Sequence, residues 1–270
     1  GVLRMTDDRV TGSGIEATLM GGPVTTSVGP PADEPGYVSR LTFEGEVAAE
    51  AVVDAFDLPL NSYLAGQTRW QGTLLLPENP APGAPGPRAP LKVSISSNLS
   101  GVALKFPEPL SKPPAEDTSF QVDFIFLQSD RLDIEGNLGT ANRFAFSLWN
   151  RDEGLSLRKG SVRFGGSYPL LPPQDGLDIR GSLGEVHLDD WLDVFADVAS
   201  QTGLGALLST ADLEFADFSA LGQHLGQTKL VIERQPPEWL VEIDSEPMAG
   251  TLVVPLDFGS GAQIVANMQQ

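Results

Sequence analysis

The chain has 270 residues and carries 36 acidic against 17 basic side chains, so its formal net charge is −19. This charge argues against binding to nucleic acid, because phosphates require a surface rich in Lys and Arg. It also argues against adhesion to anionic lipid headgroups through polybasic segments. Cysteine is absent, so the sequence offers no disulfide, no Cys metal ligand and no Cys nucleophile. The 29 glycines and 22 prolines predict many turns rather than a helical bundle.

Neither end of the chain resembles a natural terminus. Residues 1–7 do not begin with methionine and contain no signal-peptide core, and residues 261–268 stop within a strand-like pattern. No apolar run reaches the roughly 18 residues that cross a bilayer. We therefore expect a soluble piece of a longer polypeptide, whose other parts could hold a membrane anchor. Within it, residues 1–37 are predicted as an N-terminal β segment and residues 38–270 as the main region.

The first helix is predicted over residues 48–56, where three apolar residues share one side. A strand-like stretch over residues 72–76 follows. Residues 79–90 then contain five prolines, which cannot lie inside a strand or a helix. Because alternation of apolar and polar residues resumes directly afterwards, we interpret this segment as a long exposed hairpin loop.

Between residues 91 and 164 the dominant periodicity is two. Short apolar–polar alternations are separated by turn signals, the last of them at Lys159-Gly160. This pattern predicts an antiparallel meander with one apolar and one hydrophilic face. A second helix is predicted near residues 189–200, where Asp189 is a good N-cap and Trp191 and Phe195 lie on one side. The predicted fold class is therefore mainly β, an extended and twisted antiparallel sheet with one or two short helices.

The apolar face of this meander is the candidate functional surface. One interpretation is that it forms the core of a closed sandwich, whose second sheet comes from residues 200–268. The other is that the sheet curls into an open groove whose apolar lining faces lipid chains. Periodicity alone does not separate the two. The lining residues under the second interpretation are Leu91, Val93, Ile95, Phe120, Val122, Phe124, Phe126, Leu132, Ile134, Phe144, Phe146, Leu148, Leu155, Leu157, Val162 and Phe164.

Catalytic and metal-binding patterns are weak. The two histidines, His187 and His224, have no neighbouring His or Cys, so a zinc site is not expected. With 36 acidic residues a chance pair of carboxylates is expected, and none stands out as the acid–base pair of a glycosidase. The sequence therefore predicts no enzyme, no metal and no cofactor. A closed β-sandwich adaptor or carbohydrate-binding module stands as the alternative to a lipid groove, and a β-rich glycoside hydrolase as a more remote one.

Four stretches resemble the signatures of a known family. Residues 99–113 match the pattern L-x-G-φ-x-φ-x-φ-P-x-P-φ-x-K-P, and residues 63–74 place a tryptophan ahead of a strand. Residues 182–192 resemble a short helix after a meander, and residues 239–255 a W…GxφxφP strand pair. The matches keep the family's order from about residue 38 onward. In these features the chain resembles the AsmA-like proteins of the YhdP type, which are related to TamB.

The resemblance implies a function that composition and periodicity do not. Such proteins are bridge-like lipid-transfer proteins of Gram-negative bacteria, anchored in the inner membrane by an N-terminal helix and extended through the periplasm as a β groove. By this resemblance the chain is a periplasmic segment whose groove binds the acyl chains of phospholipids. It would convey phospholipids between the inner and outer membranes and so support outer-membrane integrity. Its partners would be phospholipid and the two membranes, and no residue would be catalytic.

Overall fold

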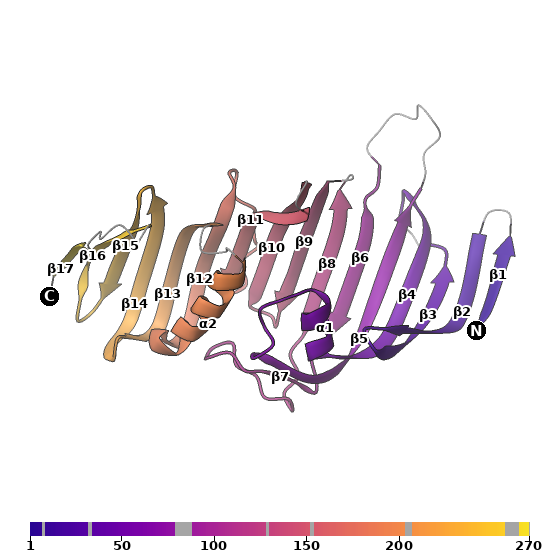
Figure 1. The fold of residues 1–270 in the computed structure, drawn as a ribbon, viewed down its shortest axis with the longest axis horizontal. Helices are drawn as coiled ribbons and strands as arrows, with labels where there is room; N and C mark the ends of the chain where they lie inside the picture. Colours follow the sequence, from indigo (N-terminus) through magenta and orange to yellow (C-terminus); the bar gives the residue numbers. More distant parts are fainter. Residues whose placement is uncertain are drawn as a thin grey trace. The chain divides into compact units, whose positions relative to one another are not determined.

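The computed structural model describes residues 1–6, 9–31, 34–78, 88–127, 130–151, 154–202, 207–256 and 265–269 (Figure 1). In this part of the chain the structure is mainly β, with seventeen strands and two short helices, which confirms the predicted fold class. The predicted Pro-rich loop at 79–90 lies mostly outside the described residues. The elements are β1 (Val2–Thr6), β2 (Arg9–Leu19), β3 (Gly22–Gly29), β4 (Tyr37–Ala48), α1 (Ala49–Ala55), β5 (Leu64–Pro77), β6 (Leu91–Ser97), β7 (Val102–Leu104), β8 (Phe120–Leu127), β9 (Arg131–Leu138), β10 (Asn142–Arg151), β11 (Gly154–Phe164), β12 (Gly176–His187), α2 (Leu188–Thr202), β13 (Leu208–Ala220), β14 (Gln223–Gln235), β15 (Glu238–Ser245), β16 (Ala249–Pro255) and β17 (Val265–Gln269).

The chain divides into two compact units, which are described separately. Unit 1 comprises residues 1–104, 113–140 and 147–157, and unit 2 comprises residues 105–112, 141–146 and 158–270. The strands β10 and β11 each contribute residues to both units. The domain boundary that the sequence suggested after residue 37 stays a prediction.

Unit 1 contains an open sheet in which neighbouring strands are antiparallel. The long strand β5 pairs with two strands on the same side: its residues 70–75 pair with β6, and its residues 64–66 pair with β7. β6 therefore continues the sheet by pairing with β8. Glycine is required where β5 meets β7, because Gly66 has a φ of +109° and a Cβ there would lie 2.2 Å from the carbonyl oxygen of Gly101.

The helix α1 packs against β4 and β5 and confirms the helix predicted over residues 48–56 (Figure 1). Its Val53 side chain is completely buried. Glu50 accepts a hydrogen bond from the backbone N–H of Gly66 at 3.2 Å, which ties the helix to the start of β5. A helix this short is not stable alone in water. Packing of Val53, which contributes about 1.5–2 kcal/mol, therefore helps to hold it in place.

Unit 2 also contains an open sheet, but two of its strand pairs are parallel. β11 and β12 run in the same direction, as do β12 and β13, whereas β13 to β17 continue as antiparallel neighbours. The sequence predicted antiparallel neighbours throughout, so these two pairs differ from the expectation. The reason is that a parallel pair needs a long crossover connection. The helix α2 supplies it between β12 and β13, and residues 165–175 supply it between β11 and β12.

An apolar cluster beneath α2 forms the main core of unit 2. Val186, Phe215 and Phe218 are buried there, and Trp191 of α2 packs against them. The ring centroids of Phe215 and Phe218 lie 4.6 Å apart. A bulge between these two residues turns both side chains to the same side of β13. The helix spans Leu188–Thr202, which confirms the helix predicted near residues 189–200.

Candidate functional site

An apolar row crosses six strands of unit 1. In an antiparallel sheet, directly paired residues lie on the same face and their side chains touch. The row consists of Val28, Leu41, Leu74, Val93, Phe124 and Ile134, each paired directly with the next. It runs through β3, β4, β5, β6, β8 and β9 without one polar side chain. At about 4.8 Å between neighbouring strands, the row is roughly 24 Å long.

The rows beside it are also apolar on β6, β8 and β9. Ile95 pairs with Val122, and Phe126 pairs with both Leu91 and Leu132. Alternation along each strand adds the remaining positions to the same face. The structure therefore brings nine of the predicted lining residues together on one face of unit 1. They are Leu91, Val93, Ile95, Phe120, Val122, Phe124, Phe126, Leu132 and Ile134.

The opposite face of these strands is polar. Its equivalent row is Thr42, Thr73, Ser94, Asp123 and Glu135, again paired one with the next. On β9, Arg131 Nη2 lies 2.7 Å from Asp133 Oδ2, and Arg131 Nε donates to Ser147 Oγ at 3.2 Å. Because Ser147 lies on the same face as Arg131, alternation places the next residue of β10, Leu148, on the apolar face. The apolar face is therefore the one that a hydrophobic ligand could cover.

The strand β11 does not keep its four predicted lining residues together. The sequence suggested a turn at Lys159-Gly160, but β11 runs unbroken from Gly154 to Phe164. Successive residues of a strand point to opposite faces. Leu155 and Leu157 therefore face away from the side that carries Val162 and Phe164, and the four cannot line a single face.

Unit 2 has an apolar face of its own. A Cβ on Gly160 would lie 3.0 Å from Phe146 Cδ1 and 2.7 Å from Leu177 Cδ1, so these two side chains cover the same side of the sheet as Gly160. The predicted residues Phe144 and Phe146 stack on each other with ring centroids 5.6 Å apart. Val162 pairs with β12 on that side. A row continues across the next strands through Ile179, Ala211, Ile232, Val241 and Leu252, each paired with the next.

Several apolar positions were missed by the sequence reasoning, which stopped at Phe164 and began at Leu91. The stretches Leu41–Phe43, Leu177–Leu183, Leu213–Phe215 and Trp239–Ile243 show the same period of two. A systematic count of alternating residues over the whole chain could have found them. The apolar surface is therefore larger than predicted in each unit.

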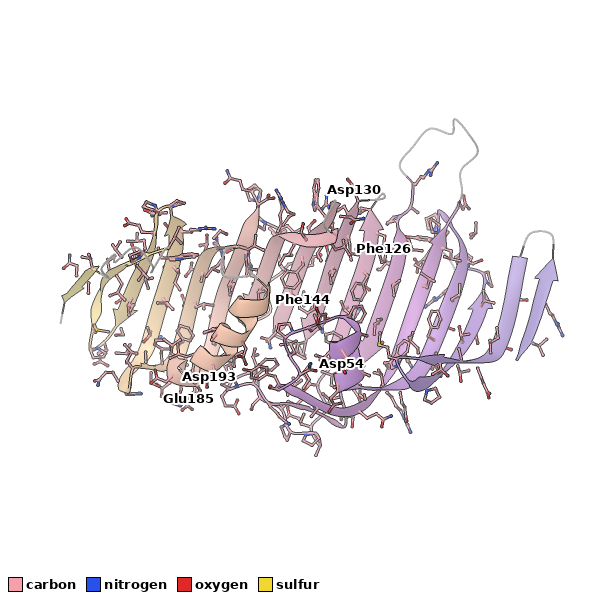
Figure 2. The ribbon with its side chains drawn as sticks, in the orientation of Figure 1. Asp54, Phe126, Asp130, Phe144, Glu185 and Asp193 are labelled. Carbon is pink, nitrogen blue, oxygen red and sulfur yellow. The ribbon has the colours of Figure 1, made fainter. Side chains whose placement is uncertain are left out.

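Among the described residues, no second sheet covers the apolar face of either unit (Figures 1 and 2). α1 lies over only one end of the strands in unit 1, and α2 does so in unit 2. Phe126, labelled in Figure 2, is 38 % exposed. The closed sandwich required a second sheet from residues 200–268. Instead, β13 to β16 extend the sheet of unit 2 edge to edge.

A buried ion network marks the polar face of unit 2. Arg163 Nη2 donates to Asp178 Oδ2 at 2.8 Å, and Arg180 Nε donates to Asp178 Oδ1 at 2.9 Å. The side chains of Arg163 and Asp178 are only 10 % and 12 % exposed. The hydrogen bond to Asp178, together with the attraction between the two charges, raises the pKa of Arg180. These contacts join β11 to β12 and are structural in character.

Both histidines lie near the same end of β12 to β14 on exposed surface. His187 contacts Ser219 through Nδ1 and Glu185 through Nε2, the latter at 2.9 Å. His224 Nδ1 lies 3.2 Å from Asp217 Oδ1. In the part of the chain that the structure describes, no group of three or more His, Asp or Glu side chains is placed to hold a metal ion.

A known protein family matches nearly the whole chain. The sequence matches the YhdP protein family over residues 1–269. The chain belongs to the YhdP family. This agrees with the resemblance seen in the motifs from residue 38 onward, and it extends the similarity to residues 1–37. The YhdP family is a bridge-like lipid-transport family of the cell envelope.

A second similarity is more limited. This YhdP-family chain is 32% identical over 147 residues to the C2 calcium-dependent domain-containing protein 4A of Homo sapiens. The aligned part is 53% of the chain and 37% of that protein, so the chain spans little more than a third of the relative's length. No solved structure matches the chain. In the described residues, no helix combines the length and the apolar character needed to span a membrane.

Proposed function

We propose that this chain is a periplasmic segment of a bridge-like lipid-transport protein. Its apolar face binds the acyl chains of phospholipids and conveys phospholipids between the inner and outer membranes. The observation that carries the proposal is the uncovered apolar row from Val28 to Ile134, with a polar row on the reverse of the same strands. Membership of the YhdP family supports it.

The energetics of this surface suit a passing hydrocarbon chain. Exposure of an acyl chain to water costs about 0.8 kcal/mol per CH₂ group, so an apolar face lowers the barrier to crossing an aqueous gap. One leaflet of a bilayer holds hydrocarbon about 15 Å deep, and the row of unit 1 is roughly 24 Å long. An acyl chain can therefore lie across several strands. Because the row contains aliphatic and aromatic side chains alone, the chain can slide along it without breaking a hydrogen bond.

The alternative functions lack this support. A sandwich adaptor or carbohydrate-binding module would cover the apolar face with a second sheet, and the described strands place none there. A glycoside hydrolase would need two facing carboxylates over a sugar-binding cleft. The apolar faces instead carry no carboxylate at their paired positions in β3 to β6, β8 and β9.

Native mass spectrometry of the chain purified from a bacterial membrane background tests the proposal. We expect co-purifying phospholipid, which Phe124→Asp removes because a carboxylate on the apolar row must remain hydrated. Gln121→Asp is the matched control, since Gln121 is exposed on the polar face of the same strand. Circular dichroism checks that both variants fold, and Phe146→Asp repeats the test in unit 2.

Three outcomes decide the matter. Lipid bound to wild type and to Gln121→Asp, but absent from folded Phe124→Asp or Phe146→Asp, supports the apolar face as the binding surface. Wild-type protein that takes up no phospholipid, even when phospholipid is added in detergent, contradicts the proposal. Equal lipid binding by both kinds of variant contradicts it as well, because the lipid would then lie elsewhere.

A further inference from the structure

Trp70 lies where the apolar face of unit 1 changes from hydroxyl groups to hydrocarbon. On this face, alternation along β5 presents Thr68, Trp70, Gly72 and Leu74 in turn. The hydroxyl oxygens of Thr68 and Ser97 lie 3.1 Å apart, and Ser97 of β6 pairs directly with Trp70. In the other direction Leu74 belongs to the apolar row, and Phe126, labelled in Figure 2, lies near the far end of the face. Trp70 therefore marks the boundary between a polar rim and the apolar row.

Two glycines make room for the indole ring of Trp70 on the sheet. A Cβ on Gly72 would lie 2.8 Å from Cζ3 of Trp70, and a Cβ on Gly45 would lie 3.2 Å from Nε1. Gly45 pairs with Trp70 from β4, so the ring covers parts of two strands. Neither glycine has a φ in the left-handed region, so the backbone conformation does not require glycine at these positions. The indole requires it, and the two glycines form a cradle that holds the ring against the apolar face.

The single hydrogen-bond donor of this ring has no partner. Tryptophan offers one N–H and no acceptor, and a buried indole usually places that donor against an oxygen. Trp191 of unit 2 does so, because its Nε1 donates to the carbonyl of Glu108 at 3.0 Å. Trp70 is half-buried, yet among the described residues no acceptor receives its Nε1–H. This nitrogen is also not one of the described buried polar atoms that lack a partner. The donor is therefore accessible to a ligand on the apolar face.

The chemistry of this position matches the ester level of a diacyl lipid. In a bilayer, tryptophan rings gather at the interface, with the ring against hydrocarbon and the N–H among polar groups. The ester carbonyls of a phospholipid lie at the same boundary between tail and headgroup, and each accepts a hydrogen bond without donating one. Leu74 of the apolar row lies about 13 Å from Trp70 along β5. The hydrocarbon of one leaflet is about 15 Å deep, so an acyl chain whose ester lies at Trp70 reaches the row.

We propose that the Nε1–H of Trp70 donates a hydrogen bond to an ester carbonyl of a diacyl phospholipid and so sets the depth at which the lipid lies on the apolar face of unit 1. This inference rests on the proposed function and names the part of the lipid that one residue recognises. A single hydrogen bond between neutral groups makes a small net contribution. It can therefore orient a lipid and still break as the lipid moves on.

Lipids that share headgroup and tails but differ in the linkage between them test the inference. The probes are dioleoyl phosphatidylglycerol, which has two ester carbonyls, and its dioleyl ether analogue, which has none. Both are titrated in detergent against the chain by native mass spectrometry. We expect wild type to bind the ester lipid about fivefold more tightly. Trp70→Phe keeps a ring but removes the donor, so it should weaken the ester lipid about fivefold and leave the ether lipid unchanged. Trp149→Phe is the control, because alternation places Trp149 on the opposite face, with Ser147.

A second measurement observes the N–H in wild-type protein. In the chain labelled isotopically at tryptophan, the Nε1–H signal of Trp70 is followed by nuclear magnetic resonance. The signal is assigned by its absence from Trp70→Phe or, if that variant does not fold, by elimination with Trp→Phe variants of the other three tryptophans. We expect the ester lipid to move this signal downfield and the ether lipid to move it less. Circular dichroism checks the fold of each variant.

The outcomes separate failure of the ester contact from failure of the lipid face. If wild type binds both lipids without preferring the ester, or if folded Trp70→Phe keeps that preference, the ester contact is overturned and the proposed function stands. Equal weakening of both lipids by Trp70→Phe also overturns it, since the ring would then serve the tail or the headgroup. If Trp70→Phe weakens binding of oleate but not of the ester lipid, the donor serves a free fatty acid and the assignment fails. Wild type that binds neither lipid overturns the proposed function and the ester contact together.

Discussion

Trp191 donates the hydrogen of its indole Nε1 to the backbone carbonyl of Glu108 at 3.0 Å, across 83 residues of sequence. The same ring stacks on Phe106 at an interplanar angle of 8° and on Phe195 at 29°. Its apolar body and its single donor are therefore both used. Through this one side chain, unit 2 joins α2 to the segment 105–112.

Replacing Trp191 separates these two contributions. Trp191→Phe keeps a ring for stacking but removes the donor, so we expect a loss of about 1 kcal/mol in the free energy of unfolding. Trp191→Ala also removes the half-buried ring and should cost about 2–3 kcal/mol. Urea denaturation followed by circular dichroism measures both. Trp149→Phe serves as control because Trp149 is 36 % exposed. If Trp191→Ala were as stable as wild type, the contacts of Trp191 with the segment 105–112 would not stabilise unit 2.

The ion network at Asp178 makes a second prediction. Asp178→Asn leaves the guanidinium of Arg163 buried without a charged partner, so we expect a loss of about 3 kcal/mol. The exposed pair of Arg69 and Glu46 is the matched control, and Arg69→Gln should cost less than about 1 kcal/mol. Chemical denaturation of the two variants gives the comparison. A smaller loss for Asp178→Asn than for Arg69→Gln would show that the network does not stabilise unit 2.

The pH dependence of this network has a definite sign. The folded-state pKa of Arg180 is raised. A cation with a raised pKa contributes stability that is complete below its unfolded pKa and is lost only as the pH rises through the folded value. Both values for an arginine lie far above neutrality. The difference in stability between wild type and Asp178→Asn should therefore stay constant between about pH 6 and pH 9.

The face of each side chain could largely be predicted from the sequence where alternation is local. Phe120, Val122, Phe124 and Phe126 lie on one face because the period of two is a property of a single strand. The pairing of strands could not be predicted in the same way. Nothing local indicates that β5 pairs with both β6 and β7, or that α2 returns the chain to make a parallel pair. These features depend on contacts between residues far apart in sequence.

The turn predicted at Lys159-Gly160 was wrong for a reason that depends on packing. Lys159-Gly160 has the composition of a turn, but Gly160 lies within β11 and pairs with Leu177 of β12. Glycine occurs there because Phe146 and Leu177 fill the space that a side chain would need. Once the strand is continuous, Leu155 and Val162 must lie on opposite faces. A packing requirement supplied by other strands thus overrode the turn propensity.

The turn between β13 and β14 makes a fourth prediction. Leu221 has a φ of +53° and is 82 % exposed, an unfavourable conformation for a leucine. The backbone N–H groups of Leu221 and Gly222 donate to the carboxylate oxygens of Asp189 at 2.9 and 3.0 Å, and these bonds hold the turn. Leu221→Asn should raise the free energy of unfolding by about 0.5–1 kcal/mol, since asparagine tolerates this region. Asp189→Ala should lower it by about 1–2 kcal/mol. Thermal unfolding measures both changes. Destabilisation by Leu221→Asn would contradict the interpretation that the backbone conformation of Leu221 is strained.

The fifth prediction concerns the apolar face of unit 2 at Gly160. A methyl group added there would lie 2.7 Å from Leu177 Cδ1 and 3.0 Å from Phe146 Cδ1. Gly160→Ala should therefore cost about 1–3 kcal/mol through overpacking. Gly184→Ala is the control on β12, because a Cβ on Gly184 meets no atom within 4 Å. In a Leu177→Ala background the same Gly160→Ala change should cost at least about 1 kcal/mol less, because the clashing group is gone. Urea denaturation of the four proteins completes the cycle. Additive losses would mean that Gly160 is required by the backbone rather than by the side chains that pack over it.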